Sequence, residues 1–266
     1  MSGTKRAKST GTGFLLLLLI VMGISAIPGR AQVSAQAQFD EANEYLDSGN
    51  YRQALSIYKS ILSSQEVSGP LFLNMGISYV QLDSLGMAKY YFLKARSFEE
   101  THNRAEEGLQ YVSSRFSRQS AVLPKLPWER FFDWLGSVTG PASLLGIGIL
   151  LLNAGVCAFI AGWFFPSASR PLQGGGIGTA ILSVLVILSS FYLQHVQNRY
   201  SPAVMVHQQA DVLEQPAPDA TLISQAYEGY TFTVDHSRSR QQPGWSYVRM
   251  SNGLYGWIPN SEIMIL

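Results

Sequence analysis

The residues that could perform nucleophilic or metal chemistry are few in this chain of 266 residues, which has one cysteine and four histidines. Cys157 lies within a long uncharged apolar run, and His207 and His236 stand alone in the sequence, without a second ligand at metal-binding spacing. A catalytic nucleophile needs a base beside it, and a zinc ion needs several spaced Cys or His ligands. The sequence therefore predicts that the protein is not an enzyme and holds no metal or cofactor. A catalytic site assembled from distant segments is the alternative.

Phosphate and nucleic acid are also poor candidates for a ligand. Gly174–Gly176 is a glycine-rich stretch, but no Lys-Ser or Lys-Thr follows it, as phosphate-binding loops require. Charged residues make up 14% of the chain and the net charge is +1, so we expect no basic surface for nucleic acid. We interpret these glycines as helix-packing residues and predict no nucleic-acid partner.

Residues 1–31 are predicted to be a signal peptide. Lys5 and Arg6 precede the apolar stretch Phe14–Ile27, and small residues follow it. A basic start, a short apolar core and small residues at its exit are typical of a secretory leader. An uncleaved membrane anchor is the alternative, and in either case we expect the chain from residue 32 onward to leave the cytosol.

Residues 141–199 contain two uncharged apolar stretches, Leu144–Phe165 and Gly174–Leu193. At about 1.5 Å per helical residue, each stretch can cross the roughly 30 Å hydrocarbon core of a membrane. The link between them is short, so we predict an antiparallel transmembrane hairpin with residues 32–140 and 200–266 on the same extracytoplasmic side. Small residues four apart let helices approach closely; these pairs are Ala158 with Gly162 and Gly174 with Gly178.

Residues 32–118 contain a pattern that recurs after 34 residues. Tyr45 is equivalent to Tyr79 in this register, and Ala54 is equivalent to Ala88. Small residues at such positions allow two antiparallel helices to touch, while aromatic residues fill the space around them. The pattern resembles the tetratricopeptide repeat (TPR), whose helical hairpins stack into a superhelix.

The TPR resemblance implies a concave groove that holds a peptide or a partner protein. Some members of the family bind a C-terminal carboxylate with Lys and Asn side chains. Asn74 and Arg104 lie at such positions, but Asp40 replaces the first Asn and would repel a carboxylate, so we do not expect that activity. The alternative is that the groove residues only pack against neighbouring helices. The candidate partner-binding residues are Phe39, Asn43, Leu46, Leu73, Asn74, Ile77 and Val80.

Residues 119–140 are predicted to be a linker with one amphipathic helix. Pro127 suits the first turn of a helix. An apolar stripe follows at helical spacing, and it consists of Trp128, Phe131, Phe132 and Leu135. Because this helix directly precedes an apolar span, we expect it to lie at the membrane interface. Packing against the repeats is the alternative.

Residues 200–266 change to alternating apolar and polar positions, which is typical of strands. Asn252-Gly253 lies between two such runs and predicts a tight hairpin. The skeleton W-x-x-V-R…G-x-x-G-W-I resembles the bacterial SH3-like domain, a small β-barrel, in which Gly256 would allow two strands to approach closely. Aromatic side chains of this module form a candidate groove for a ligand, and the alternative is that several of them are core residues. The candidates are Tyr230, Trp245, Tyr247, Tyr255 and Trp257.

The order of the parts resembles the BatE-type proteins of the bacterial aerotolerance operon. The phrases "LPWERFFDWL" before the first span and "GLYGWIP" near the end carry much of this likeness. The predicted fold class is multidomain α + β, with a TPR-type α-α superhelix, a transmembrane helical hairpin and a small SH3-like β-barrel. The resemblance implies a non-enzymatic protein of the bacterial inner (cytoplasmic) membrane, with both folded domains in the periplasm. It also implies membrane partners that carry von Willebrand A-type domains, and a role in stress tolerance or envelope integrity.

Two functions remain open at this point. In the first, the repeats and the barrel each hold an envelope protein, and the chain is a membrane-anchored adaptor. In the second, the barrel binds peptidoglycan peptides and the repeats are a spacer.

Overall fold

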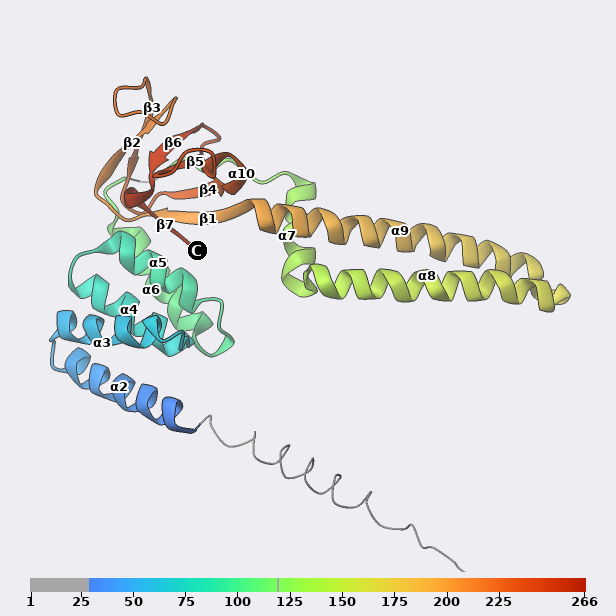
Figure 1. Ribbon diagram of the computed structural model, residues 1–266, viewed down its shortest axis with the longest axis horizontal. Coiled ribbons are helices and arrows are strands. Elements are labelled where there is room, and N and C mark those ends of the chain that lie inside the picture. The colour runs from blue at the N-terminus through green and yellow to red at the C-terminus, as the bar shows by residue number, and fades with distance from the viewer. Residues whose placement is uncertain (1–28, 119) are drawn as a thin grey trace, which may run out of the picture. The chain divides into compact units, whose positions relative to one another are not determined.

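The computed structural model describes residues 29–118 and 120–266 (Figure 1). The predicted signal peptide lies outside these residues except for its last three, which begin the first helix. The chain combines helices with one antiparallel sheet, as predicted, and divides into two compact units. Of the described residues, the first unit consists of residues 29–84 together with Tyr91–Leu109, and the second consists of Leu85–Tyr90 together with Gln110–Leu266.

Five helices occupy the predicted repeat region. They are α2 (Gly29–Asp47), α3 (Tyr51–Ser63), α4 (Gly69–Gln81), α5 (Leu85–Ala95) and α6 (His102–Arg115), with a 3₁₀ turn at Glu99–Thr101 before α6. The start of α4 shows why the chain becomes helical at this point. The side chain of Ser68 accepts a hydrogen bond from the backbone N–H of Leu71, and a proline follows within the first turn.

Small residues allow the helices of the first unit to pack closely around one aromatic ring. A Cβ atom on Gly76 would lie 2.6 Å from the ring of Phe92, and one on Gly108 would lie 2.8 Å from it. Tyr79 stacks on Tyr91 at 5.4 Å between ring centroids. Of these contacts, the one between Gly76 and Phe92 joins a small and an aromatic position of the 34-residue pattern.

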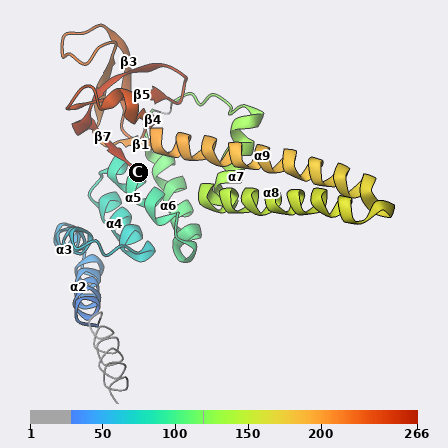
Figure 2. The same ribbon diagram turned by 45° about the vertical axis from the view of Figure 1, so that its right-hand side comes forward.

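The second unit contains two long apolar helices, α8 (Gly140–Phe164) and α9 (Ser169–Arg199), joined by a 3₁₀ turn at Pro166–Ala168. Figures 1 and 2 show them side by side along their length. Both are long and apolar enough to cross a membrane by length and composition. At about 1.5 Å per residue, the 25 residues of α8 extend over about 37 Å.

Small residues seven apart form the contact between α8 and α9. The buried small residues are Gly148, Gly155 and Gly162 on α8 and Gly176, Ser183 and Ser190 on α9. A Cβ on Gly155 would lie 2.8 Å from the carbonyl oxygen of Gly176, and Ser183 Oγ donates to Gly148 O at 2.8 Å. The predicted pair Gly174 and Gly178 lies elsewhere, because a Cβ on either would meet nothing within 4 Å. The prediction is therefore wrong for this pair, whereas Gly162 of the other predicted pair is buried in the contact. A seven-residue repeat keeps one face of each helix against its neighbour.

Helix α7 (Pro127–Val138) precedes the two apolar helices, and Pro127 lies in its first turn as predicted. The N–H of Leu126 donates to the side chain of Glu129 at 2.9 Å, which closes the start of the helix. Phe132 packs against Tyr192 of α9, with ring centroids 4.7 Å apart. The exposed face instead consists of Trp128, Phe131, Trp134 and Val138, each at least half exposed. The stripe predicted from the sequence therefore divides between a contact with α9 and an open aromatic face.

Seven strands follow α9 without a break in the chain. They are β1 (Tyr200–Met205), β2 (Gln209–Leu213), β3 (Leu222–Tyr227), β4 (Thr231–Asp235), β5 (Trp245–Met250), β6 (Tyr255–Pro259) and β7 (Ile263–Ile265). All pairings are antiparallel, in the order β3-β2-β6-β5-β4-β1-β7. The short helix α10 (His236–Ser239) and a 3₁₀ turn at Asn260–Glu262 complete the unit. The core of the sheet consists of apolar side chains such as Met205, Val212, Phe232, Val248 and Ile258.

Two glycines explain the path of β5 and β6. Gly253 has φ +86° in the connection between them, which confirms the tight hairpin predicted at Asn252-Gly253. A Cβ on Gly256 would lie 2.6 Å from Val212 Cγ1 and 2.8 Å from the carbonyl oxygen of Leu213. Strand β2 therefore crosses β6 at a distance that no larger residue allows, and the predicted close approach at Gly256 is confirmed.

Candidate functional site

A concave site of about 580 Å³, here called the groove, lies within the first unit. It is lined by residues of α2, α3, α4 and the start of α6. Four of the seven predicted partner-binding residues contribute to it, namely Asn43, Leu46, Asn74 and Ile77. The other lining residues are Asp47, Tyr51, Gln81 and Arg104.

Two side-chain amides and one phenol form a hydrogen-bonded network at the groove. Tyr58 donates from its hydroxyl to Asn43 Oδ1 at 2.7 Å, and Asn74 Nδ2 donates to the same oxygen at 2.9 Å. Two hydrogen bonds to its oxygen therefore fix the orientation of the Asn43 amide. Within the described part of the chain, the N–H groups of Asn43 and the Oδ1 atom of Asn74 have no partner, so one donor group and one acceptor remain for a ligand.

The phenol of this network stays protonated at physiological pH. Burial raises the pKa of Tyr58 to about 12, and the nearby charge of Asp47 raises it as well, against a hydrogen bond with Asn74 that lowers it. Because the hydroxyl keeps its proton, it remains a donor to Asn43. The groove also presents one carboxylate, Asp47, and one guanidinium, Arg104, among otherwise neutral side chains.

The remaining predicted groove residues lie outside the groove. Leu73 is only 2% exposed and belongs to the packed interior, because its position on α4 turns it toward the neighbouring helices. Phe39 packs against the ring of Tyr58 at 5.9 Å, and Val80 is half-buried without lining the groove. Asp40 does not line the groove either, since it accepts a hydrogen bond from Gln36 Nε2 at 2.8 Å on the exposed side of α2.

A second candidate site lies on the outer face of β5 and β6 in the second unit. Alternate residues of these strands point away from the core, which places Tyr247 opposite Trp257 and Arg249 opposite Tyr255. Tyr247 stacks on Tyr255 at 6.2 Å and meets Trp257 edge-on at 5.2 Å. We call these three residues, Tyr247, Tyr255 and Trp257, the aromatic patch.

Two arginines cover rings of the aromatic patch. The guanidinium carbon of Arg238 lies 4.5 Å from the ring centre of Tyr247, and that of Arg249 lies 5.8 Å from the ring centre of Tyr255. Flat aromatic faces with adjacent guanidinium groups can bind apolar or planar groups together with an anion.

The other two aromatic candidates occupy different surroundings. Trp245 is half-buried and lies on the same outer side of β5, opposite Pro259. Tyr230 packs against the core of the sheet and against the ring of Tyr227, at 5.7 Å, so it is not part of the aromatic patch. The structure therefore brings together three of the five candidates, with Trp245 beside them.

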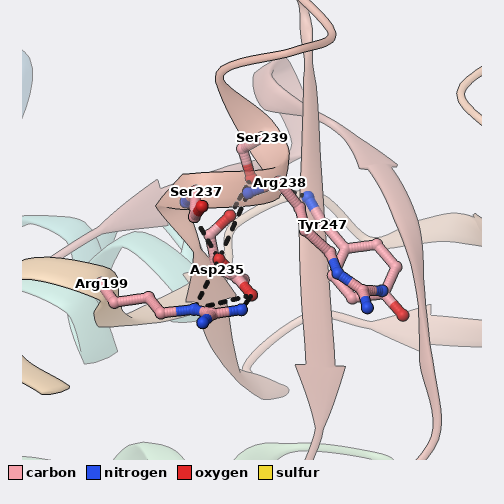
Figure 3. A network of polar contacts seen from close by, with 6 residues as sticks. All are labelled: Arg199, Asp235, Ser237, Arg238, Ser239 and Tyr247. Atoms are coloured by element: carbon pink, nitrogen blue, oxygen red, sulfur yellow. Dashed lines mark hydrogen bonds and ion pairs between the residues drawn. The ribbon is translucent and has the colours of Figure 1, made fainter.

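A polar network that the sequence did not predict joins the end of α9 to the aromatic patch (Figure 3). Arg199, the last residue of α9, contacts Asp235 with two nitrogens, at 2.9 Å from Nη2 and 3.3 Å from Nε. Asp235 Oδ1 also accepts from the backbone N–H groups of Ser237 and Arg238 and so caps α10. Ser239 Oγ then accepts from the backbone N–H of Tyr247 at 2.9 Å.

The carboxylate of Asp235 is held in its charged form. Burial raises the pKa of Asp235, but the hydrogen bond from Arg199 and those from the backbone of Arg238 and Ser237 outweigh burial, so the pKa lies below its ordinary value of 3.8. The Asp235 side chain is 9% exposed and that of Arg199 is 35% exposed. The ion pair therefore fixes the sheet to the helix that precedes it. The sequence signal that could have predicted this cap is an Asp directly before the short polar segment His236–Ser239.

Three histidines have separate local partners. His102 Nδ1 lies 3.0 Å from Arg96 O, His207 Nδ1 lies 3.3 Å from Glu262 Oε2, and His236 Nε2 lies 2.9 Å from Ser201 Oγ. Each of these contacts ties a loop or a helix end to a neighbouring segment.

A comparison of the chain with protein-family models and with curated proteins finds no match.

Proposed function

We propose that the protein is a membrane-anchored, non-enzymatic adaptor that binds other envelope proteins. In this proposal, the paired helices are TPR-type repeats and the antiparallel sheet is an SH3-like barrel. Helices α8 and α9 form a transmembrane hairpin, and α7 lies at the membrane interface with its aromatic face toward the lipid.

The preorganised amides of the groove are the observation that carries this proposal. Asn43 is fixed by Tyr58 and Asn74, and among the described residues its N–H groups and the Oδ1 atom of Asn74 have no hydrogen-bond partner. A peptide backbone offers one carbonyl and one N–H per residue and can pair with both amides at once. Since the two side chains are already ordered, binding costs less conformational entropy than it would with mobile side chains.

Anchoring of both binding surfaces by the membrane hairpin strengthens the overall binding of partners that each surface holds only weakly. Two binding surfaces on one anchored chain hold their partners at high effective concentration, so two weak contacts can act as one stronger contact. The resemblance to BatE-type proteins supports an inner-membrane location with both folded parts in the periplasm. It also supports partners with von Willebrand A-type domains and a role in aerotolerance or envelope integrity.

Site-specific photo-cross-linking in intact cells tests the adaptor function. A photoreactive residue at Ile77, within the groove, should form an adduct with a membrane-bound envelope protein. The same residue at Ser60, an exposed position of α3 outside the groove, is the matched control and should give no adduct. Asn43→Leu should abolish the Ile77 adduct. If Ile77 and Ser60 yield the same products, or if no captured protein belongs to the envelope, the adaptor function is refuted.

The aromatic patch favours one alternative, in which the sheet binds cell-wall peptides. Tyr247, Tyr255 and Trp257 form an outward surface with two arginines beside it, and peptidoglycan peptides carry carboxylates. Such a surface could bind the side of a short anionic peptide, with the repeats acting as a spacer.

Pull-down on purified sacculi separates the two functions. The detergent-solubilised full chain should bind sacculi only if the alternative holds, and Trp257→Ala should then abolish binding while circular dichroism shows a folded protein. Leu222→Ala, at an exposed apolar residue of β3, is the control. No binding by the wild-type chain rejects the cell-wall function.

A further inference from the structure

Asn153 is a polar side chain in an unusual place. It lies near the middle of α8, in a helix otherwise made of apolar and small residues, and it is exposed on the side away from α9. Its Nδ2 atom donates to the carbonyl oxygen of Ile149 at 2.8 Å. If α8 spans a membrane, as the proposed function states, this amide faces the hydrocarbon core.

The hydrogen bond to Ile149 uses only one of the two N–H donors of the Asn153 amide. A carboxamide has two N–H donors and an oxygen that accepts two bonds. Within the described residues, the second N–H and the Oδ1 atom of Asn153 have no partner. By contrast, Thr179 and Ser189 on α9 each place their single hydroxyl proton on a backbone carbonyl one turn earlier. Asn153 therefore keeps an unmet donor and an unmet acceptor where no water is available.

The residues around Asn153 form a continuous surface on the outer side of α8. Gly146 lies two turns before it, and a Cβ on that glycine would meet nothing within 4 Å. Leu150, Cys157 and Ile160 are exposed on the same side. We call these five residues, Gly146, Leu150, Asn153, Cys157 and Ile160, the Asn153 face. Its smallest members leave space for a second helix to approach closely.

We propose that two copies of the chain pair in the membrane along the Asn153 face, with their Asn153 amides hydrogen-bonded to each other. Two copies with the same topology place every residue of α8 at the same depth, so Asn153 meets Asn153. When a residue meets its own copy across a two-fold axis, the same group must both donate and accept, and the carboxamide does both. A different membrane protein would need a polar side chain at this particular depth, whereas a second copy provides it without further requirement.

The only cysteine of the chain tests this pairing without an engineered reporter. Cys157 is exposed one turn after Asn153, so it lies close to its copy in the proposed pair. Oxidation of intact membranes with copper phenanthroline should yield a disulfide-linked dimer of twice the chain mass. Asn153→Leu should lower the initial rate of dimer formation about threefold to thirtyfold, as expected for the loss of an interhelical hydrogen bond in a membrane. Asn153→Gln, which keeps the amide, should retain more dimer than Asn153→Leu.

A matched cysteine on α9 is the control. Leu185 is exposed on α9, so Leu185→Cys combined with Cys157→Ser should give little cross-linking. The pairing is refuted if Leu185→Cys cross-links as well as Cys157. It is also refuted if Asn153→Leu leaves the rate unchanged, or if the Cys157 product contains another protein. Fractionation of the same samples separates the two proposals: a chain found in the membrane that fails to cross-link refutes only the pairing, and a chain found outside the membrane refutes both.

Discussion

Replacement of Asp235 by Ala should destabilise the sheet and loosen its connection to α9. The change removes a two-nitrogen contact with Arg199 and the two backbone hydrogen bonds that cap α10. The Arg199 side chain is 35% exposed and can turn to water, which lowers the cost of losing its partner. The backbone N–H groups of Ser237 and Arg238 lose the side chain that caps α10.

The magnitude follows from these contacts. Loss of the cap costs about 1 kcal/mol of unfolding free energy. Loss of hydrogen bonds to a charged group costs about 1.5–3 kcal/mol, and the exposure of Arg199 places this value toward the lower end. The sum is about 2.5–4 kcal/mol. For a folded region of this size, each kcal/mol lowers Tm by about 4–8 °C, so we expect Tm to fall by about 10–30 °C.

The assay uses the full chain in lipid nanodiscs. Thermal unfolding followed by near-ultraviolet circular dichroism reports Tm, and hydrogen exchange reports protection of β1, β4 and β5. Asp219→Ala, at an exposed carboxylate of the second unit, is the matched control and should leave both unchanged. A Tm shift for Asp235→Ala that is no larger than the shift for Asp219→Ala would show that the network does not stabilise the sheet.

Three further predictions concern pH, packing and the groove. Because the folded pKa of Asp235 lies below 3.8, the stability that its charge provides is present above pH of about 4 and is lost as pH falls through the folded value. The Tm difference between wild type and Asp235→Asn should therefore vanish in strong acid, and a difference that persists there would contradict the assignment. Gly256→Val should lower the unfolding free energy by about 1–3 kcal/mol, measured by urea titration, because its side chain would overlap Val212, and an unchanged midpoint would refute this contact. Tyr58→Phe should cost about 0.5–1.5 kcal/mol and reduce adduct formation at Ile77, and full retention of the adduct would show that the network does not order the groove.

The helical and strand segments could be predicted from the sequence because their signals are local. Small residues such as Gly76 predict a close helix contact, and the structure shows the ring of Phe92 in that space. Asn252-Gly253 predicts a hairpin because few other dipeptides adopt its backbone conformation, and Gly253 has the expected positive φ. In each case the residue type itself restricts the structure.

Two kinds of contact could not be predicted. One joins residues that are far apart in the sequence, and the other depends on which side of a helix faces its neighbour. Arg199 and Asp235 are far apart in the sequence, and neither residue indicates its partner. The spacing rule for small residues favoured Gly174 and Gly178, but the direction in which a helix faces follows from its partner, and Gly155 with Gly176 forms the contact. Leu73 was expected in the groove but is buried. The helix period shows which residues share a face, but it does not show which face is buried.

Labelling with a membrane-impermeant maleimide tests the central claim most directly, namely that a membrane hairpin holds both folded parts on one outward side. The reporters are single cysteines at Ser64, Ser167 and Asp219, all exposed positions, placed in a Cys157→Ser background. In intact spheroplasts, Ser64→Cys and Asp219→Cys should be labelled, and Ser167→Cys should be labelled only after the membrane is permeabilised. Labelling of only one of the first two, or of all three without permeabilisation, would contradict the claim.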